Sequence, residues 1–417
     1  MVDLLLRNCR LPDRDDAVDV SLVNGRIAHV GEALAPAADE AREVVDGGGR
    51  LLTPGLVESH IHLDKALLTG RVTTTAGTLE EAIRVTGEAK RRFTVDDIRA
   101  RARQVLDLAI AAGTTTMRTH VEVDPIVGLA GMEAIVPLKR EYAAALDLQI
   151  CAFAQEGILQ APGTETLMRR ALAMGADLVG GCPYNDTDAV EHIRIVFALA
   201  RAFDVDIDFH VDFSDEPDHL HVREIAERTV RQGWQGRVAV GHLTEIAALD
   251  EVLAGDVITA IAGAGLGVIC LPATDLYLMG RNDRMNVRRG LTPIRQLLAA
   301  GVPVALATNN VRNAFTPVGT ADLAHLTFLA AVAAHMGTPD DLRALVHTIT
   351  THPARILNLP DVGLTTGCRA DLVLWDCERV DEVVTAQPGR RLVVKHGRVT
   401  VESERRVRWR WREEMIG

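Results

Sequence analysis

Two histidines stand one residue apart in the stretch VESHIHLDK, which runs from Val57 to Lys65. An apolar run, LLTPGLVESHIH, leads into them, and residues i and i+2 of a strand point to the same side. His60 and His62 are therefore expected to hold two imidazoles together at a strand end. Neutral imidazole nitrogens are good ligands for Zn²⁺ and Fe²⁺, so the pair predicts part of a metal site.

Further polar residues recur at the ends of later apolar runs, and we interpret them as parts of the same site. They are His120 after TTTMRT, Gln155 and Glu156 after ICAFA, His210 and Asp212 in DFHVD, His242 after VAVG, and Asn309 and Asn310 after VALAT. Histidines that gather at strand ends are hard to explain by packing, although His120 taken alone fits a hydrogen-bonded core residue better than a ligand.

The elements that must position these residues alternate along the middle of the chain. Short, nearly continuous apolar runs are separated by Ala- and Leu-rich amphipathic stretches such as TVDDIRARARQVLDLAIAAG. This rhythm is typical of parallel βα units. About eight units are present, which predicts a closed (β/α)₈ barrel with its site at the C-terminal ends of the strands. The alternative, a doubly wound open sheet, would need a Gly-rich phosphate turn after its first strand, and none is present.

The two ends of the chain have a different pattern, with short apolar runs broken by Asn-Gly and Gly-Gly turns. That pattern predicts antiparallel hairpins. We expect an α/β protein whose small β-sandwich domain is built from both termini, residues 1–54 and 358–417, around a barrel over residues 55–357. The alternating VRWRWRE near the C-terminus predicts a strand with one charged face, better explained by solvation than by nucleic-acid binding.

Bulk composition excludes several classes of protein. The 417 residues carry a formal net charge of -12, which disfavours binding to nucleic acid or anionic membranes. Six scattered cysteines form no C-x-x-C pair, and no P-C-x-x-C zinc signature of nucleic-acid deaminases occurs. No signal peptide and no run of about 18 apolar residues is present. The cytoplasm is therefore the expected compartment.

Taken in order, these segments resemble the amidohydrolase superfamily, in particular its cytosine deaminase and N-isopropylammelide amidohydrolase branch. The resemblance covers almost the whole chain and rests on TPGLVESHIHLDK, TTTMRTHVEVD, ICAFAQEGIL, GADLVGGCPYND, DVDIDFHVDFSD, GRVAVGH and NNVRNAFTPVGTADL. It implies a (β/α)₈ barrel and a small-molecule substrate, and it makes a homo-oligomer the expected assembly.

The resemblance also implies roles for individual residues. His60, His62 and His210 match the metal-ligating histidines, and His242 matches the histidine that contacts the attacking water or the developing charge. Gln155 matches a glutamine that binds the substrate ring, whereas Lys65 is typical of the triazine branch. His120, Phe213 and Asn310 are expected to complete the substrate site. One divalent metal per chain is implied, with zinc first and iron, cobalt or manganese as alternatives.

Two positions depart from the family pattern. Phe213 stands where cytosine deaminases have a proton-shuttling glutamate, and Asn309 stands where the metal-binding, general-base aspartate is expected. An amide can offer its oxygen to a metal but cannot take a proton. Proton transfer would then fall to His242 or Asp212, with Asn309 kept as a ligand.

Three explanations of these departures are open: a natural subgroup with altered chemistry, a catalytically weak relative with a binding role, and an engineered Asp-to-Asn change. The neighbouring asparagines in NNVRN favour divergence over a single swap. We therefore predict a metal-dependent hydrolase of a C–N bond in an amide, cyclic amide, amidine or N-substituted heterocycle. Cytosine itself is disfavoured as the substrate because Phe213 replaces a charge with an apolar wall.

Overall fold

Eight parallel strands form the central sheet of the protein. The structure is a computed structural model, and it describes residues 2–14, 16–31 and 41–410. The strands follow one another in chain order around the sheet, and every residue of the first two is buried. They are β6 (Leu56–Ile61), β7 (Thr114–Glu122), β8 (Asp147–Ala154), β9 (Leu178–Gly181), β10 (Asp206–Val211), β11 (Val238–His242), β12 (Gly267–Cys270) and β13 (Val304–Leu306).

The sheet closes into a barrel between its first and last strands. The backbone N–H of His62 donates to the Asn309 carbonyl at 2.8 Å, and the Asn309 N–H donates to the His60 carbonyl at 2.8 Å. Asn309 has a φ of 56°, a left-handed conformation that asparagine adopts more readily than most residues. Closure therefore brings the predicted ligands of the first and last strands side by side, and the barrel prediction is confirmed.

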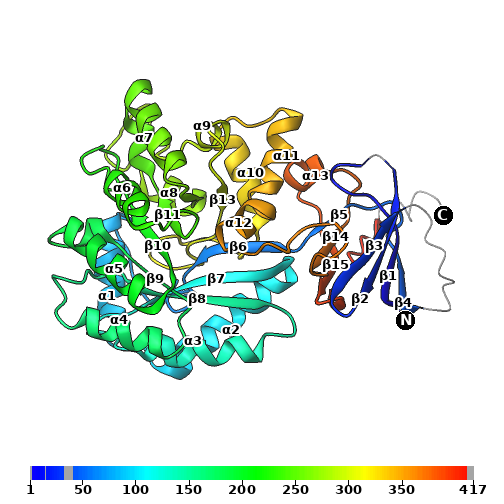
Figure 1. Cartoon of the computed structure of the whole chain (residues 1–417), viewed down its shortest axis with the longest axis horizontal. Coiled ribbons are helices and arrows are strands. Elements are labelled where there is room, and N and C mark those ends of the chain that lie inside the picture. The colour runs from blue at the N-terminus through cyan, green and yellow to red at the C-terminus, as the bar shows by residue number, and fades with distance from the viewer. Residues whose placement is uncertain (1, 15, 32–40, 411–417) are drawn as a thin grey trace.

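Helices surround the barrel, as Figure 1 shows. In α2, the Thr94 side chain caps the N-terminus by accepting from the Asp97 N–H, and buried apolar side chains recur at helical spacing to pack on the barrel. The helices are α1 (Leu79–Lys90), α2 (Val95–Ala111), α3 (Ala130–Glu141), α4 (Thr164–Ala173), α5 (Ala189–Phe203), α6 (Val222–Gln232), α7 (Glu251–Gly263), α8 (Pro272–Leu278), α9 (Ile294–Ala299), α10 (Leu323–Ala333), α11 (Pro339–His347), α12 (Thr351–Ile356), α13 (Val380–Thr385), and the short 3₁₀ helices η2 (Pro183–Asn185) and η3 (Thr244–Ala248).

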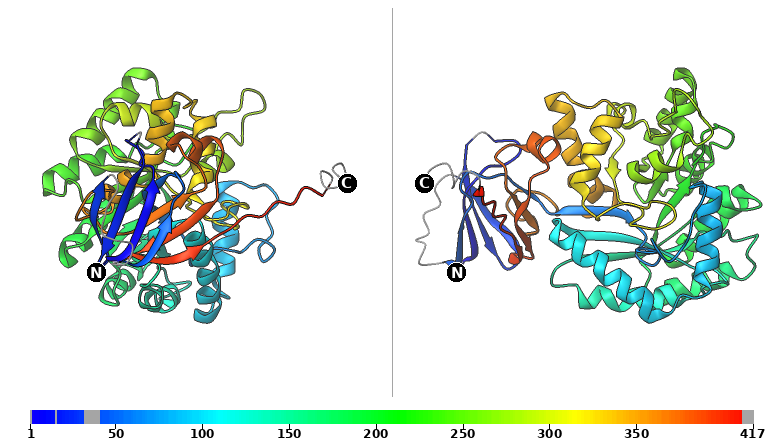
Figure 2. Two further views of the ribbon diagram at one scale, coloured as in Figure 1. Left: turned by 90° about the vertical axis from the view of Figure 1, so that its right-hand side faces the viewer. Right: turned by 180° about the vertical axis from the view of Figure 1, so that it is seen from behind.

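Two four-stranded sheets lie at one end of the barrel and draw their strands from both ends of the chain (Figures 1 and 2). One contains β1 (Val2–Cys9), β2 (Val18–Val23), β3 (Arg26–Gly31) and β4 (Ala41–Asp46), and the other contains β5 (Leu52–Pro54), β14 (Leu372–Trp375), β15 (Arg390–Lys395) and β16 (Arg398–Glu402). Leucines of both sheets share one apolar cluster, which makes the pair a small sandwich. The expected boundaries at residues 54 and 357 stay a prediction.

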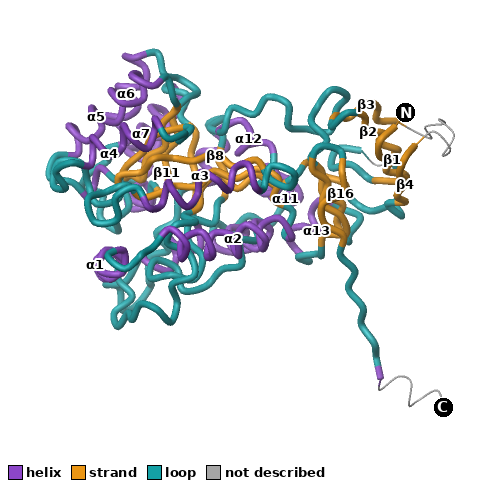
Figure 3. Tube along the Cα trace, turned by 90° about the horizontal axis from the view of Figure 1, so that it is seen from below, coloured by secondary structure: helices purple, strands orange, loops and turns teal. Residues whose placement is uncertain are grey.

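The chain beyond β16 differs from the sequence prediction. No strand is found in residues 403–410, which are all exposed and leave the body as an extended segment in Figure 3. Within the described residues, the Ser403 N–H donates to the Arg391 carbonyl of β15 at 3.1 Å, but the strand pairing ends with β16, so the prediction of a strand here was wrong. The last part of that predicted strand, from Trp411, lies outside the described residues. In the described part of the chain, no helix is long and apolar enough to span a membrane.

Candidate metal centre and substrate cavity

Four buried histidines meet at the C-terminal ends of the barrel strands. The Nε2 atoms of His60 and His210 lie 2.5 Å apart, closer than ordinary N–H···O hydrogen bonds. The rings of His62 and His210 have centroids 5.3 Å apart. His120 stacks on His60 at 3.7 Å, and ligand atoms of His60, His120 and His210 all fall within 4.8 Å of one another. The expected ligands from the first and fifth strands are thus brought together.

The electrostatics of this group suit a cation. Burial lowers the pKa of His60 to about 3 and holds the pKa values of His62 and His210 well below the ordinary value. The rings are therefore neutral, which is the form that binds metal. Both ring nitrogens of His62 and the Oδ1 atom of Asn309 are buried and lack a hydrogen-bond partner among the described residues. Buried nitrogen and oxygen atoms without hydrogen-bond partners are suitable ligands for a divalent metal ion.

Asp208 was missed by the sequence prediction. Its Oδ1 atom lies 3.7 Å from His60 Nδ1 and 3.4 Å from His120 Nε2, and its Oδ2 accepts from Arg118 at 3.1 Å. A carboxylate behind a ligating imidazole fixes the orientation of the ring. The signal was present in DFH, because Asp208 and His210 lie two residues apart on one face of β10.

His242 lies beside His210, with ring centroids 4.9 Å apart. Its Nδ1 atom is 2.7 Å from Oδ1 of Asp275, a fully buried carboxylate in α8 that the sequence prediction also missed. Phe213 stacks on the His242 ring at 3.9 Å and 25°. Phe213 therefore holds a histidine in place at the position where the family pattern has an acid.

Asp212 is directed elsewhere than we expected. Its carboxylate accepts from the backbone N–H groups of His221 at 2.8 Å and Val222 at 3.1 Å, at the start of α6. The left-handed φ of 52° at Asp212 follows the end of β10 and turns the side chain to this helix. Burial, together with the nearby Glu245, raises its pKa to about 7. This geometry favours a capping role for Asp212 over the role of catalytic base.

A small cavity adjoins the histidines, with a volume of about 10 Å³. That is room for roughly one water molecule, so a ring-sized ligand needs the surrounding side chains to move. His60, His120 and Asp212 are not among its lining residues, which leaves the expected substrate contact of His120 without support. The lining residues are His62, Lys65, Leu79, Gln155, Tyr184, His210, Phe213, His242, Thr274, Asn309, Asn310 and Phe315.

Charged groups hold Lys65 at the cavity wall. Its Nζ atom lies 2.5 Å from Glu122 Oε1 and 3.4 Å from Gln155 Oε1, and it lies over the Phe315 ring at 4.3 Å. Glu122 is shared with Lys90, 2.5 Å away. Glu122, Asp124 and Glu156 form a second acidic group; the Lys90 ammonium lies within 2.9 Å of all three carboxylates, so a lysine cation already occupies this group.

Comparison with known proteins decides the family. The model of the Amidohydrolase family matches residues 43–401. The chain belongs to the amidohydrolase family. It is 28% identical over 415 residues to N-isopropylammelide isopropyl amidohydrolase of Pseudomonas sp. (strain ADP), covering 96% of this chain and 98% of that protein. It is 29% identical over 385 residues to pterin deaminase of Rhizobium rhizogenes, with 91% and 87% covered.

Solved structures agree with this assignment. The 5-methylcytosine deaminase of Klebsiella pneumoniae, liganded with 5-fluorocytosine, superposes with a TM-score of 0.93 at 31% identity, covering 98% of this amidohydrolase and all of that chain. The resemblance inferred from the sequence is confirmed. This amidohydrolase is a hydrolase that acts on carbon-nitrogen bonds other than peptide bonds.

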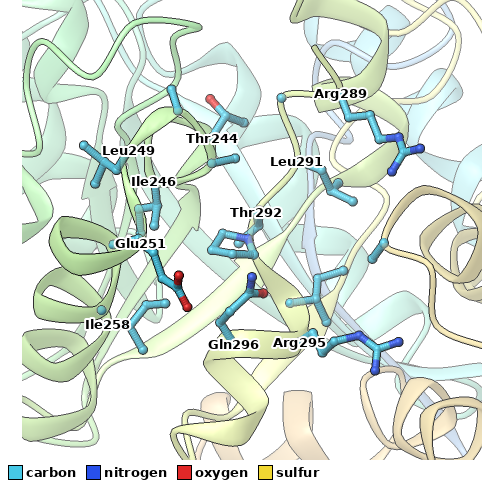
Figure 4. A pocket seen from close by; sticks show the side chains of 18 of the residues that line it. Thr244, Ile246, Leu249, Glu251, Ile258, Arg289, Leu291, Thr292, Arg295 and Gln296 are labelled. Atoms are coloured by element: carbon cyan, nitrogen blue, oxygen red, sulfur yellow. The ribbon is translucent and has the colours of Figure 1, made fainter.

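A second hollow of about 960 Å³ lies outside the histidine group, between α7, α9 and the loop before α9 (Figure 4). Thr244, Glu251, Arg289 and Arg295 are among its lining residues. Arg289 and Arg295 each donate to a backbone carbonyl, so these guanidinium groups already have partners. No group of metal-ligating side chains lies in this hollow within the described residues, and the candidate site of the amidohydrolase is the histidine cavity.

Proposed function

We propose that this amidohydrolase holds one divalent metal ion, zinc in the first place, with His60, His62, His210 and the amide oxygen of Asn309. Two observations carry the proposal: the Nε2 atoms of His60 and His210 lie 2.5 Å apart, and both ring nitrogens of His62 and the Asn309 oxygen are buried without hydrogen-bond partners among the described residues. All four groups are neutral, so the ion would keep its full positive charge. When bound, such an ion supplies a Lewis acid that makes a water molecule nucleophilic near neutral pH.

The substrate that fits best is an N-heterocycle with a ring carbonyl and an exocyclic amino or alkylamino group, or a cyclic amide. Lys65 and the Gln155 amide face the cavity and can bind a ring N–C=O edge. Phe213, Phe315 and Leu79 supply apolar walls, which suit an alkylamine leaving group. The triazine, pterin and pyrimidine named for the relatives belong to this class. Cytosine itself is the poorer substrate, because no carboxylate stands at position 213.

The protein's own groups divide the remaining work. Hydrolysis adds the elements of water across the C–N bond, so a proton must leave the water and reach the departing amine. Asn309 has no basicity for this step. His242 lines the cavity, and imidazole is the side chain that most often accepts and returns a proton in catalysis. Lys65 and Gln155 hold the ring so that the C–N carbon faces the histidines.

The experiment is a screen of triazines, pterins, pyrimidines, cyclic ureas and N-alkyl amides for release of ammonia or amine by zinc-loaded protein. The proposal predicts turnover of at least one N-substituted heterocycle and slower turnover of cytosine. A protein with a binding role would bind ring compounds without releasing amine. Efficient hydrolysis of cytosine over all other compounds would overturn the substrate assignment.

A further inference from the structure

His242 is held by contacts from three directions. Asp275 lies against Nδ1 at 2.7 Å, Phe213 covers one ring face, and Thr292 Oγ1 donates to the His242 carbonyl at 2.5 Å. The backbone of His242 has a left-handed φ of 74°, which a non-glycine residue keeps only when its surroundings enforce it. This much restraint on one side chain indicates that its exact orientation matters.

We infer that Asp275 is the positioning residue that fixes the ring of His242, with the proton on Nδ1 and the lone pair of Nε2 available to the cavity. The direction of the hydrogen bond follows from the other oxygen of the carboxylate. Asp275 Oδ2 accepts from the Leu271 N–H at 3.3 Å, and Oδ1 faces Nδ1. An ionised carboxylate has no hydrogen to donate, so His242 must donate from Nδ1; a neutral imidazole carries only one N–H, which leaves Nε2 as an acceptor.

The assignment gives Asp275 a task that Asn309 cannot take over. The Nε2 lone pair of His242 is the basic group of the cavity, because the Asn309 amide is not basic. A carboxylate that fixes the tautomer of a histidine base works through the imidazole and touches no reacting atom. The inference therefore rests on the proposed function for its kinetic consequence, while the tautomer itself is independent of any substrate.

Asp275→Asn tests the assignment sharply. The Leu271 N–H needs an oxygen, so the new amide should place its oxygen there and its NH₂ group against Nδ1. That NH₂ group donates, which forces the proton of His242 to Nε2. Nitrogen NMR of ¹⁵N-histidine-labelled, zinc-loaded protein, assigned with His242→Gln, should show the proton on Nδ1 in the wild type and on Nε2 in the variant.

The kinetic readout uses the best compound from the screen. Asp275→Asn should lower kcat at least about 100-fold with KM within about threefold and with zinc content unchanged. Asp186→Asn is the matched control, since Asp186 pairs with the buried His192 Nδ1 at 2.8 Å and neither residue lines the cavity. It should lower stability while leaving kcat within about twofold.

Two results would overturn the assignment: a proton on Nε2 in the wild type, or an Asp275→Asn variant with the wild-type tautomer and kcat. A failure of the proposed hydrolase function would give a different result from a failure of the tautomer assignment. If no compound is hydrolysed by the wild type, the NMR comparison still decides the tautomer. If Asp275→Asn does not fold, the wild-type spectrum alone decides it.

Discussion

Asn309 is the residue with the largest expected effect on the metal chemistry of this amidohydrolase. Its backbone closes the barrel against His60 and His62, and its buried Oδ1 has no hydrogen-bond partner among the described residues. An amide oxygen can ligate a cation but adds no negative charge to it. We therefore expect a weaker hold on the metal than a carboxylate would give, and a stronger pull on the electrons of a bound ligand.

Asn309→Asp should tighten zinc binding by about tenfold or more, because an anionic ligand adds Coulombic attraction in a buried site. Competition with a chromophoric chelator measures this. Asn310→Asp is the matched control, since Asn310 also lines the cavity but accepts a hydrogen bond from Asn313. Equal zinc affinity in Asn309→Asp and the wild type would show that position 309 is not a ligand.

Glu122 gives a prediction about acid stability. Burial alone would raise its pKa, but the ammonium groups of Lys65 and Lys90 prevail and hold it below the ordinary value. A carboxyl group whose pKa is depressed on folding stabilises the protein above its unfolded pKa, about 4.3, and loses that contribution as the pH falls. In the wild type, the free energy of unfolding should therefore drop from about pH 5 down to about pH 2, the depressed pKa of Glu122.

Glu122→Gln should flatten this drop, as measured by urea unfolding across the same pH range. Glu227→Gln, at an exposed position on α6, should leave it unchanged. If the pH dependence of Glu122→Gln matched the wild type, the lysines would not be holding Glu122 ionised.

The predictability of the site also varied from residue to residue. His60, His62 and His210 were accessible from the sequence because strand ends and i, i+2 spacing fix their direction. Asp208 shares the i, i+2 spacing with His210, but its partners His60 and His120 lie on other strands, so its role was missed. The role of Asp275 was missed because it lies in α8, after the seventh strand, whereas its partner His242 lies on the sixth. The predicted placement of Asp212 was wrong because its own left-handed backbone directs the carboxylate to α6. No local sequence pattern predicts that backbone conformation.

Among the elements, α1 connects the cavity to the buried lysine–carboxylate group. Leu79 at its start lines the cavity, and Lys90 at its end binds carboxylates at the ends of β7 and β8. The C-terminal end of the helix is thus held by the ion pairs of Lys90, and its N-terminal end lies beside the cavity. The cavity holds about one water, so Leu79 of α1 borders the space that a bound ring would occupy.

Lys90→Met should destabilise the protein by about 3–5 kcal/mol, because it leaves buried carboxylates without their cation. Urea unfolding gives the cost, and amide hydrogen exchange should show faster exchange in α1. Lys139→Met is the control, since Lys139 makes a similar pair with Asp177 at 2.7 Å on the surface, where about 1 kcal/mol or less is expected. Equal costs in the two variants would contradict the anchoring role.

At this scale the sequence predicted most of the architecture. The alternation of apolar runs and amphipathic stretches is repeated eight times, so errors in single boundaries do not change the barrel. The prediction for residues 403–410 was wrong because alternation was taken as sufficient for a strand, whereas a strand also needs a neighbouring strand to pair with. Here the edge of the second sheet ends with β16.

At the scale of the whole molecule, the resemblance to the family predicts a homo-oligomer. Light scattering of purified protein should then give a mass that is a multiple of 45.2 kDa, largely independent of salt if apolar surface dominates the contact. A mass of one chain at all accessible concentrations would contradict this expectation and leave the barrel as a monomeric enzyme.

The most direct test of the central claim is hydrolysis by the same protein sample before chelation, after chelation and after addition of zinc. The account predicts about one metal ion per chain, release of amine from an N-substituted heterocycle, loss of both on chelation, and return of both with zinc. His60→Ala should bind little metal and release no amine. Amine release that persists in metal-free protein would contradict the account.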